Sequence, residues 1–280
     1  MKIKSLEPQY TNEAAINLGA EAAVEKGRYL YCVADARERL SLGTIGIEGS
    51  EVYTVSCGDI CAVVHECPAQ PYESTDREVV ESWVIIHQKV VDVAWERWGT
   101  VLPMSFDTII KGESGESAQQ NVRDWLKEEY TVLKSRMDKM RGKAEYGVQV
   151  FWDPKLVAEN LVQTSPEIKK LDEEIRSKSK GLAYMYRQKL ENVMKHEMEA
   201  KADEWFKDFY GRIREIADDI RVEKTKKAAQ GLQMMMNLSC LVCTDRYAEL
   251  GEELDKIDRT EGFSVRFTGP WPPYSFAGNA

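Results

Sequence analysis

Apolar residues in this chain follow two spacings, an alternating one that is typical of strands and a three-to-four-residue one that is typical of helices. Residues 28–34 form a β-rich apolar run and predict the first strand. Two more short runs, 51–56 and 60–65, flank Gly58 and Asp59, which favour a tight turn. The second and third runs are therefore expected to form a hairpin.

The next segment predicts a long amphipathic helix that packs on a sheet. Ser74, Thr75 and Asp76 offer an N-cap, and the helix is expected to run to about Trp98, before Gly99. Its apolar positions recur every three or four residues. They are Val80, Trp83, Val84, His87, Val90, Val91, Ala94 and Trp98.

Two further elements complete the first half of the chain. Residues 101–106 predict a short edge segment, because Pro103 has no N–H to contribute to a central strand. A second helix is expected over residues 117–140. Its apolar face carries Val122, Trp125, Leu126, Tyr130, Leu133 and Met137.

The second half opens with a predicted strand over residues 146–152 and continues in a helical region to about residue 229. Pro166 and Gly181 are expected to divide this region into shorter pieces. From Leu182 onward apolar residues recur at helical spacing, and charged residues fill the other faces. This pattern predicts an arm of paired helices.

The chain closes with a predicted strand over residues 235–244, a helix from its Asp245 cap to about Thr260, and a strand over residues 263–268. The whole pattern predicts an α+β fold with two domains, each a small mixed sheet packed by helices. The second domain is expected to be ferredoxin-like with a long helical insertion.

The expected boundaries follow from these elements. Residues 1–27 are interpreted as a flexible leader, 28–142 as an N-terminal α+β domain, and 143–280 as a C-terminal α+β domain. The helical arm occupies about residues 154–229 of the C-terminal domain.

Charge narrows the range of partners. The formal net charge of -9 and the pI near 5.1 work against a basic surface for nucleic acid or anionic lipid. No apolar run approaches the roughly 20 residues that cross a bilayer, and no apolar block follows Met1 and Lys2 as in a secretory signal. We therefore expect a cytoplasmic protein with no nucleic-acid partner and no membrane contact.

The cysteines predict thiols rather than a disulfide framework, because six are few for a chain of 280 residues. Cys240 and Cys243 have a C-x-x-C spacing, but they fall within a predicted strand, where residues three apart point to opposite faces. They are therefore interpreted as structural. The full set is Cys32, Cys57, Cys61, Cys67, Cys240 and Cys243.

One cysteine-rich stretch keeps a catalytic alternative open. Cys57 and Cys61 flank the predicted turn, and His65 and Cys67 follow it, so a zinc- or thiol-dependent enzyme that uses the Cys57–Cys67 region remains an alternative. The set is incomplete as a pattern of metal ligands, and the favoured prediction is no metal.

The remaining chemistry is sparse. His87 lies on the apolar stripe of its helix and is interpreted as a core histidine with one hydrogen bond, whereas His196 sits among charges and is expected in solvent. The chain has neither a phosphate-binding P-loop nor a G-x-S-x-G nucleophile motif. These observations predict a binding protein that is not an enzyme and needs no cofactor.

The end of the chain is unusual. Between Val265 and Phe276 three prolines stiffen the backbone, and large rings are present at Trp271 and Tyr274 as well as at Phe276. This segment closely resembles the C-terminal signature of the gas vesicle protein F/L family (GvpF and GvpL).

A second match lies in the first half, where residues 29–31, 58–64, His87 and 101–106 fall in the order seen in that family. The resemblance therefore spans about residues 28–276.

The match departs from the family pattern after Met104. Ser105 and Asp107 stand where family members usually carry an arginine and a glycine. No role of that arginine is carried over to this chain.

The resemblance implies a minor structural component or assembly accessory of gas vesicles, with two α+β domains and no enzymatic activity. It implies that the partners are the small hydrophobic main shell protein and other gas vesicle accessory proteins, and that the location is the gas vesicle. The arm leaves self-association possible.

Two interpretations of the C-terminal rings remain open, docking of the tail on its own sheet and direct contact with a partner. The residues expected to bind a partner are Trp271, Pro272, Pro273, Tyr274, Phe276, Leu102, Pro103 and Met104.

Overall fold

The structure is a computed structural model that describes residues 26–112, 116–228 and 231–278. The expected leader, 1–27, lies outside the described residues except for Lys26 and Gly27. These two residues belong to the first strand, which begins two positions earlier than predicted.

The first sheet contains six strands within the described residues, in the order β2-β3-β4-β1-β5, with β6 also paired to β1. All the pairings are antiparallel, so the mixed sheet expected here is wrong. The strands are β1 (Lys26–Ala34), β2 (Ser41–Gly43), β3 (Val52–Cys57), β4 (Ile60–Pro68), β5 (Val101–Pro103) and β6 (Ile109–Lys111), with the short 3-10 helix η1 (Ile47–Gly49) between β2 and β3. The predicted hairpin is confirmed, because β3 and β4 pair from Cys57↔Ile60 outward.

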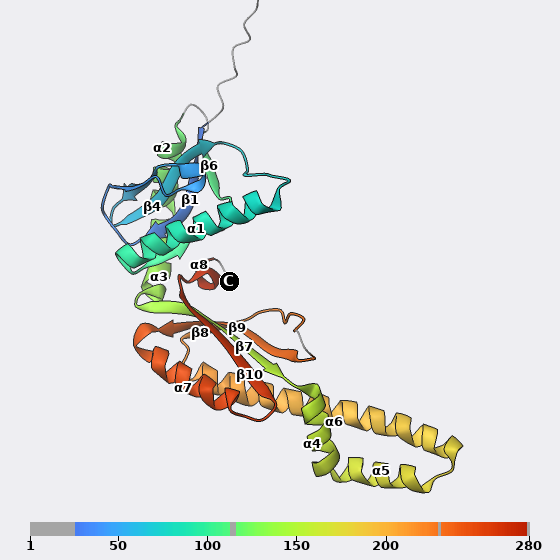
Figure 1. Ribbon diagram of the computed structural model, residues 1–280. Helices are drawn as coiled ribbons and strands as arrows, with labels where there is room; N and C mark the ends of the chain where they lie inside the picture. Colours follow the sequence, from blue (N-terminus) through green and yellow to red (C-terminus); the bar gives the residue numbers. More distant parts are fainter. Residues whose placement is uncertain (1–25, 113–115, 229–230, 279–280) are drawn as a thin grey trace, which may run out of the picture.

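Helices cover both faces of this sheet (Figure 1). The helix α1 (Arg77–Trp98) packs on one face, and α2 (Ala118–Glu128) and α3 (Tyr130–Met140) pack on the other. Asp76 caps α1 by accepting a hydrogen bond from the backbone N–H of Glu78, as predicted. The single helix expected over residues 117–140 is wrong, since the chain breaks at Glu129 and continues as a second helix.

The second sheet contains four antiparallel strands among the described residues, in the order β10-β7-β9-β8. These strands are β7 (Lys143–Trp152), β8 (Asp219–Val222), β9 (Gln233–Cys243) and β10 (Phe263–Trp271). Along the chain a helical segment joins β7 to β8, and a further helix joins β9 to β10.

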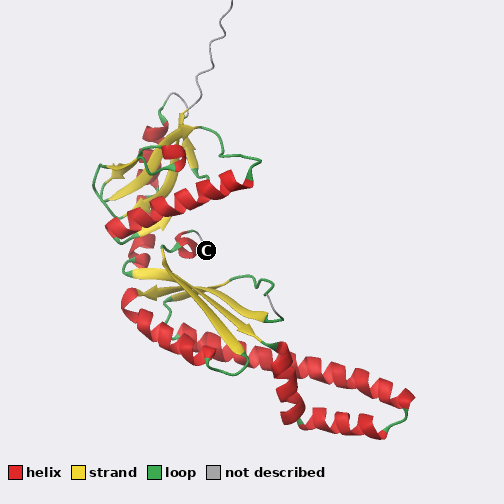
Figure 2. Ribbon diagram, in the orientation of Figure 1, coloured by secondary structure: helices red, strands yellow, loops and turns green. Residues whose placement is uncertain are grey.

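The longer helices of this half lie on one face of the sheet (Figure 2). They are α4 (Pro154–Thr164), α5 (Pro166–Ser177), α6 (Lys180–Arg214) and α7 (Tyr247–Asp258). The C-terminal half of α6, together with α7, buries the apolar side chains of the strands. The rest of α6 runs beyond the sheet with α4 and α5 and forms the arm.

Three helix expectations in this half are wrong. The helical region ends at Arg214 rather than near residue 229, because the Asp219–Val222 segment forms β8 on the edge of β9. Gly181 does not divide the region, since it lies inside α6. Asp245 does not cap a helix, because it lies in the 3-10 turn η2 (Thr244–Arg246) that precedes α7.

A third apolar cluster joins the two sheets. It combines residues of α2, α3 and the first sheet with Leu241 of β9 and with Phe276 and Ala277 of the short helix α8 (Tyr274–Ala277). The C-terminal segment therefore contributes to a core far from it in sequence.

Candidate functional site

The structure brings together two segments that the sequence singled out 170 residues apart. Leu102, Pro103 and Met104 lie along a groove of about 400 Å³ that is also lined by Tyr274. The other expected partner-binding residues do not line it. Trp271 is 50% exposed at the end of β10, and Pro272, Pro273 and Phe276 are buried.

The C-terminal tail, residues 271–278, lies close to β7 and β9 (Figure 1), and side chains of these strands hold it at the groove. The backbone N–H of Ser275 donates to Glu145 Oε2 at 2.7 Å, and the Ser275 hydroxyl contacts Glu145 Oε1 and the hydroxyl of Ser239. The guanidinium carbon of Arg221 lies 5.5 Å from the centre of the Phe276 ring. Buried tail residues therefore fix the position of Tyr274.

The opposite wall of the groove comes from α2 and α3, and sequence analysis missed it. Trp125 and Leu133 were expected on one apolar face, and they do pack in the apolar cluster beside the first sheet. They also line the groove, together with Glu129 and Arg136. The two helices meet at Glu129, where α2 ends and α3 begins. No sequence signal marked this break.

The groove combines apolar side chains with polar groups. Arg136 donates to the carbonyl oxygen of Ala277 at 3.3 Å and so joins α3 to the tail. Glu129 contributes a carboxylate, and Ser105 a hydroxyl. The exposed surface of the groove is therefore about equally polar and apolar, so it can hold an apolar side chain of a partner and pair with polar groups beside that side chain.

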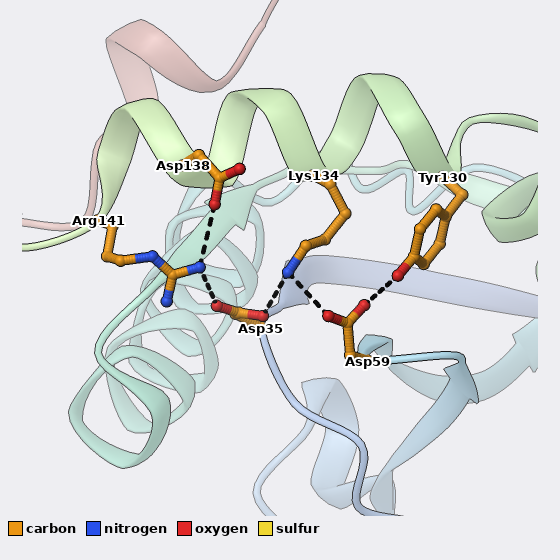
Figure 3. Close-up of polar contacts among 6 residues, drawn as sticks. All are labelled: Asp35, Asp59, Tyr130, Lys134, Asp138 and Arg141. Carbon is orange, nitrogen blue, oxygen red and sulfur yellow. Dashed lines mark hydrogen bonds and ion pairs between the residues drawn. The ribbon is translucent and has the colours of Figure 1, made fainter.

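A network of charges positions α3, as Figure 3 shows. Lys134 Nζ lies 3.0 Å from Asp35 Oδ1 and 3.1 Å from Asp59 Oδ2. Arg141 contacts the second oxygen of Asp35 at 2.7 Å, and the Tyr130 hydroxyl donates to Asp59. The network joins α3 to the end of β1 and to the β3–β4 turn.

The network stabilises the charged forms of the side chains in it. The hydrogen bonds from Tyr130 and Lys134 lower the pKa of Asp59, and the hydrogen bond to Asp35 raises the pKa of Lys134. Lys134 and Asp35 are mostly shielded, with side chains 21% and 15% exposed. Because Leu133 and Arg136 are on the same helix, the network also fixes the groove wall.

Two buried histidines lie on the α1 side of the first sheet, against Tyr29 and Tyr31. His87 Nδ1 is 2.8 Å from the Tyr29 hydroxyl, and His87 Nε2 is 3.2 Å from the carbonyl oxygen of Met104. His87 is therefore a core histidine as predicted, with two hydrogen bonds instead of one. Burial lowers its pKa to about 4, so the ring is neutral near pH 7.

His65 is similarly enclosed. Its Nε2 is 2.9 Å from the Tyr72 hydroxyl, while its Nδ1 is buried with no hydrogen-bond partner among the described residues. Burial, followed by the nearby charge of Arg28, lowers the pKa of His65 to about 4. The third histidine, His196, is exposed on α6, as expected.

The departure at residue 107 has a structural explanation. Asp107 adopts a φ of 67°, a left-handed conformation that favours glycine. Its Oδ1 accepts a hydrogen bond from the backbone N–H of Tyr72 at 3.0 Å, and its own N–H donates to the Tyr29 hydroxyl. Aspartate therefore occupies a glycine-type turn and adds a side-chain contact.

The structure does not assemble the Cys57–Cys67 region into one site. Cys61 and Cys67 face the α1 side of the first sheet, whereas Cys57 packs with the cluster on the α2–α3 side. Burial raises the pKa of Cys61 to about 12 and that of Cys67 to about 11, which disfavours reactive thiolates. The alternative of a zinc- or thiol-dependent enzyme is therefore not favoured.

The C-x-x-C pair is also separated. Cys240 is fully buried against the helices, and Cys243 is partly exposed at the end of β9. Burial raises the pKa of Cys240 to about 12. Across the described residues, no group of three or more His, Cys, Asp or Glu side chains is arranged to hold a metal ion.

None of the helices within residues 26–112, 116–228 and 231–278 combines the length and the apolar character needed to span a bilayer.

These features define a class of protein: an α+β protein with two sheets, a projecting helical arm, and a groove built from both halves of the chain. The family model for "Gas vesicle synthesis protein GvpL/GvpF" matches residues 27–278. The chain belongs to this family, and its role is therefore related to gas vesicles.

Individual relatives agree with this assignment. The chain is 30% identical over 265 residues to gas vesicle protein L1 of Halobacterium salinarum, covering 92% of each chain. It is 25% identical over 256 residues to gas vesicle protein F2 of the same organism, covering 90% of this chain and 92% of that one.

The fold is also similar to a solved structure. The crystal structure of the gas vesicle protein GvpF from Anabaena superposes with a TM-score of 0.71 at 18% identity, covering 91% of this chain and 99% of that chain.

Proposed function

We propose that this chain is a gas vesicle accessory or minor structural protein that binds the main shell protein and other accessory proteins during assembly. The groove lined by Leu102, Met104, Trp125 and Tyr274 is the contact surface. One observation carries this proposal: both segments that resemble family signatures contribute to this single groove. Its apolar side chains suit contact with a hydrophobic shell subunit, and Glu129 and Arg136 add polar groups for hydrogen bonds.

Co-purification of tagged protein with shell protein tests the groove. Met104→Glu places a charge in it and is expected to lower shell-protein recovery at least about tenfold, equivalent to about 1.4 kcal/mol. Val132→Glu is the matched control, because Val132 is an exposed apolar residue of α3 outside the groove lining. Equal recovery with both folded variants contradicts the groove proposal.

A deletion strain tests the assembly role itself. Cells without this protein are expected to lack mature gas vesicles, and normal vesicles would contradict an assembly role. If the deletion abolishes vesicles but Met104→Glu restores them, the role stands and a different surface makes the contact.

We also propose that this protein is not an enzyme. This proposal is supported by the separation of the cysteines and by the raised thiol pKa values of Cys61 and Cys67. Metal analysis of the purified protein is the test, and a stoichiometric metal would favour an enzyme.

We also infer two domains, 28–142 and 143–280, the second of them ferredoxin-like. The ferredoxin-like assignment is supported by the order of elements along the chain, which is strand β7, helices, strands β8 and β9, helix α7 and strand β10. The 30% identity to an L-type relative, against 25% to an F-type relative of the same organism, supports an L-type protein.

Self-association through the arm stays a prediction. Leu182, Tyr184 and Met185 of α6 are 51–65% exposed and provide an apolar surface for a second helix. Light scattering over a concentration series is the measurement.

A further inference from the structure

The strand β10 leaves one edge of the second sheet open. It pairs with β7 on one side, and no strand within the described residues pairs with its other side. On that outer side, the backbone N–H of Val265 donates to Asp258 Oδ1 at 2.7 Å. Since backbone groups alternate in direction along an edge strand, the N–H and C=O of Phe267 also point outward.

A groove runs beside this edge, between β10 and α7, which lies under the sheet in Figure 1. Its volume is about 300 Å³. Small residues on α7, Ala248 and Gly251, leave room in it, and a Cβ built on Gly251 meets no atom within 4 Å. The full lining is Tyr247, Ala248, Gly251, Leu254, Asp255, Asp258, Val265 and Phe267.

Aromatic rings form one end of the groove. Tyr247 is 46% exposed and stacks on Phe267 with 5.8 Å between ring centres, and Tyr146 stacks against both. An apolar side chain that enters the groove would therefore meet ring faces at this end and Leu254 below.

The charges of the groove all have one sign. Asp255 and Asp258 line it, and no lysine or arginine does. The closest cation to Asp255 is Arg259, one turn along the exposed helix at 3.7 Å. The surface therefore favours a ligand with lysine or arginine next to its apolar residue.

We propose that β10 and α7 form a docking site for an extended peptide segment of a partner protein, which adds to the sheet as a further strand. Its backbone pairs with the outer edge around Phe267, one apolar side chain enters the groove over Gly251, and a flanking basic residue pairs with Asp255 and Asp258. An edge strand gives affinity through main-chain hydrogen bonds, and an adjacent pocket gives specificity. This site shares no lining residue with the groove that contains Met104.

Peptide binding to the full chain tests the proposal. The probes are pooled acetylated and amidated heptapeptides with alternating apolar and polar positions, flanked by lysine in one pool and by glutamate in the other. Lysine-flanked peptides are expected to bind at least about tenfold more tightly than glutamate-flanked ones, as followed by fluorescence polarisation. Bound peptide is expected to slow hydrogen exchange at Phe267.

Gly251→Leu fills the groove and is expected to weaken binding at least about tenfold while the protein stays folded, since leucine favours a helix more than glycine does. Gly211→Leu is the matched control, because Gly211 is also helical with open space around it and lies outside the groove. Asp255→Asn is expected to reduce the preference for lysine.

Three outcomes would overturn the site: no peptide of either pool binds, Gly251→Leu binds as the unmodified chain does, or exchange protection appears only away from β10. None of these outcomes depends on how much shell protein the Met104→Glu variant recovers. The docking site at β10 and α7 and the groove that contains Met104 can therefore be disproved independently.

Discussion

The backbone N–H of Ser275 donates a 2.7 Å hydrogen bond to the carboxylate of Glu145, which is only 8% exposed on β7. This contact joins residues 130 positions apart and places the tail between the two sheets. It makes the groove dependent on a buried acid in the second half of the chain.

Replacing that acid should therefore loosen the tail. Glu145→Ala removes the acceptor for both the N–H and the hydroxyl of Ser275, and we expect a loss of about 2–3 kcal/mol in the free energy of unfolding. Urea denaturation followed by tryptophan fluorescence measures it. Glu252→Ala, at an exposed position of α7, should change the value by less than about 0.5 kcal/mol; similar losses in both variants would show that Glu145 does not hold the tail.

The left-handed residue before β6 gives a second prediction. Asp107→Ala keeps the φ of 67° but loses the contact to Tyr72, so we expect a loss of about 1–3 kcal/mol in unfolding free energy. Asp107→Gly removes the backbone strain and should be more stable than Asp107→Ala by about 1 kcal/mol. Thermal unfolding of the pair is the measurement, and the opposite order would contradict the turn conformation.

Stability should fall in mild acid because of the buried histidines. Folded His65 and His87 have pKa values of about 4, below the ordinary 6.5, so the unfolded chain binds more protons between these values. The free energy of unfolding is expected to drop as pH falls through this window, by about 2–3 kcal/mol per histidine at about pH 4.5.

Substitutions separate the contribution of the histidines to the pH dependence of stability from the contribution of the carboxylates. His87→Gln should flatten the pH dependence of urea unfolding between about pH 7 and pH 4.5, even if it lowers stability at neutral pH. His196→Gln, at an exposed position, should leave the slope unchanged. An unchanged slope in His87→Gln would mean that His87 takes up a proton in the folded protein as readily as in the unfolded chain.

The ion network on α3 gives a fourth prediction. Lys134→Met leaves Asp35 without one cation and Asp59 without an ion partner among the described residues, and we expect a loss of about 1–3 kcal/mol in unfolding free energy. Lys195→Met disrupts an exposed pair and should cost less than about 0.5 kcal/mol. Urea denaturation measures the unfolding free energy of both variants. Equal losses would show that the shielded network stabilises the protein no more than an exposed ion pair does.

Local patterns predicted many elements because their signals are local. The N-cap at Asp76 and the apolar stripe that follows it in the sequence predicted α1, although the sheet on which α1 packs was not known. The Gly58–Asp59 turn likewise placed the β3–β4 hairpin.

The same local reasoning failed where two patterns coincide. Ile213, Ile216 and Ile220 fit a helical spacing, yet Ile220 lies in β8 and pairs with Cys240. A four-residue strand carries too few positions to show alternation, so the available edge of β9 decided its conformation. The break at Glu129 was invisible for a similar reason, since helical propensity continues across it.

By itself, the sequence determined the family, the α+β class, the main helices and strands, and the residues of both signature segments. Only the tertiary structure decided that Met104 and Tyr274 share a groove, that Trp125 and Arg136 form its other wall, and that Phe276 is buried. The physical reason is the range of the interactions involved: caps, turns and stripes act within a few residues, whereas a groove depends on contacts between segments that are distant in the chain.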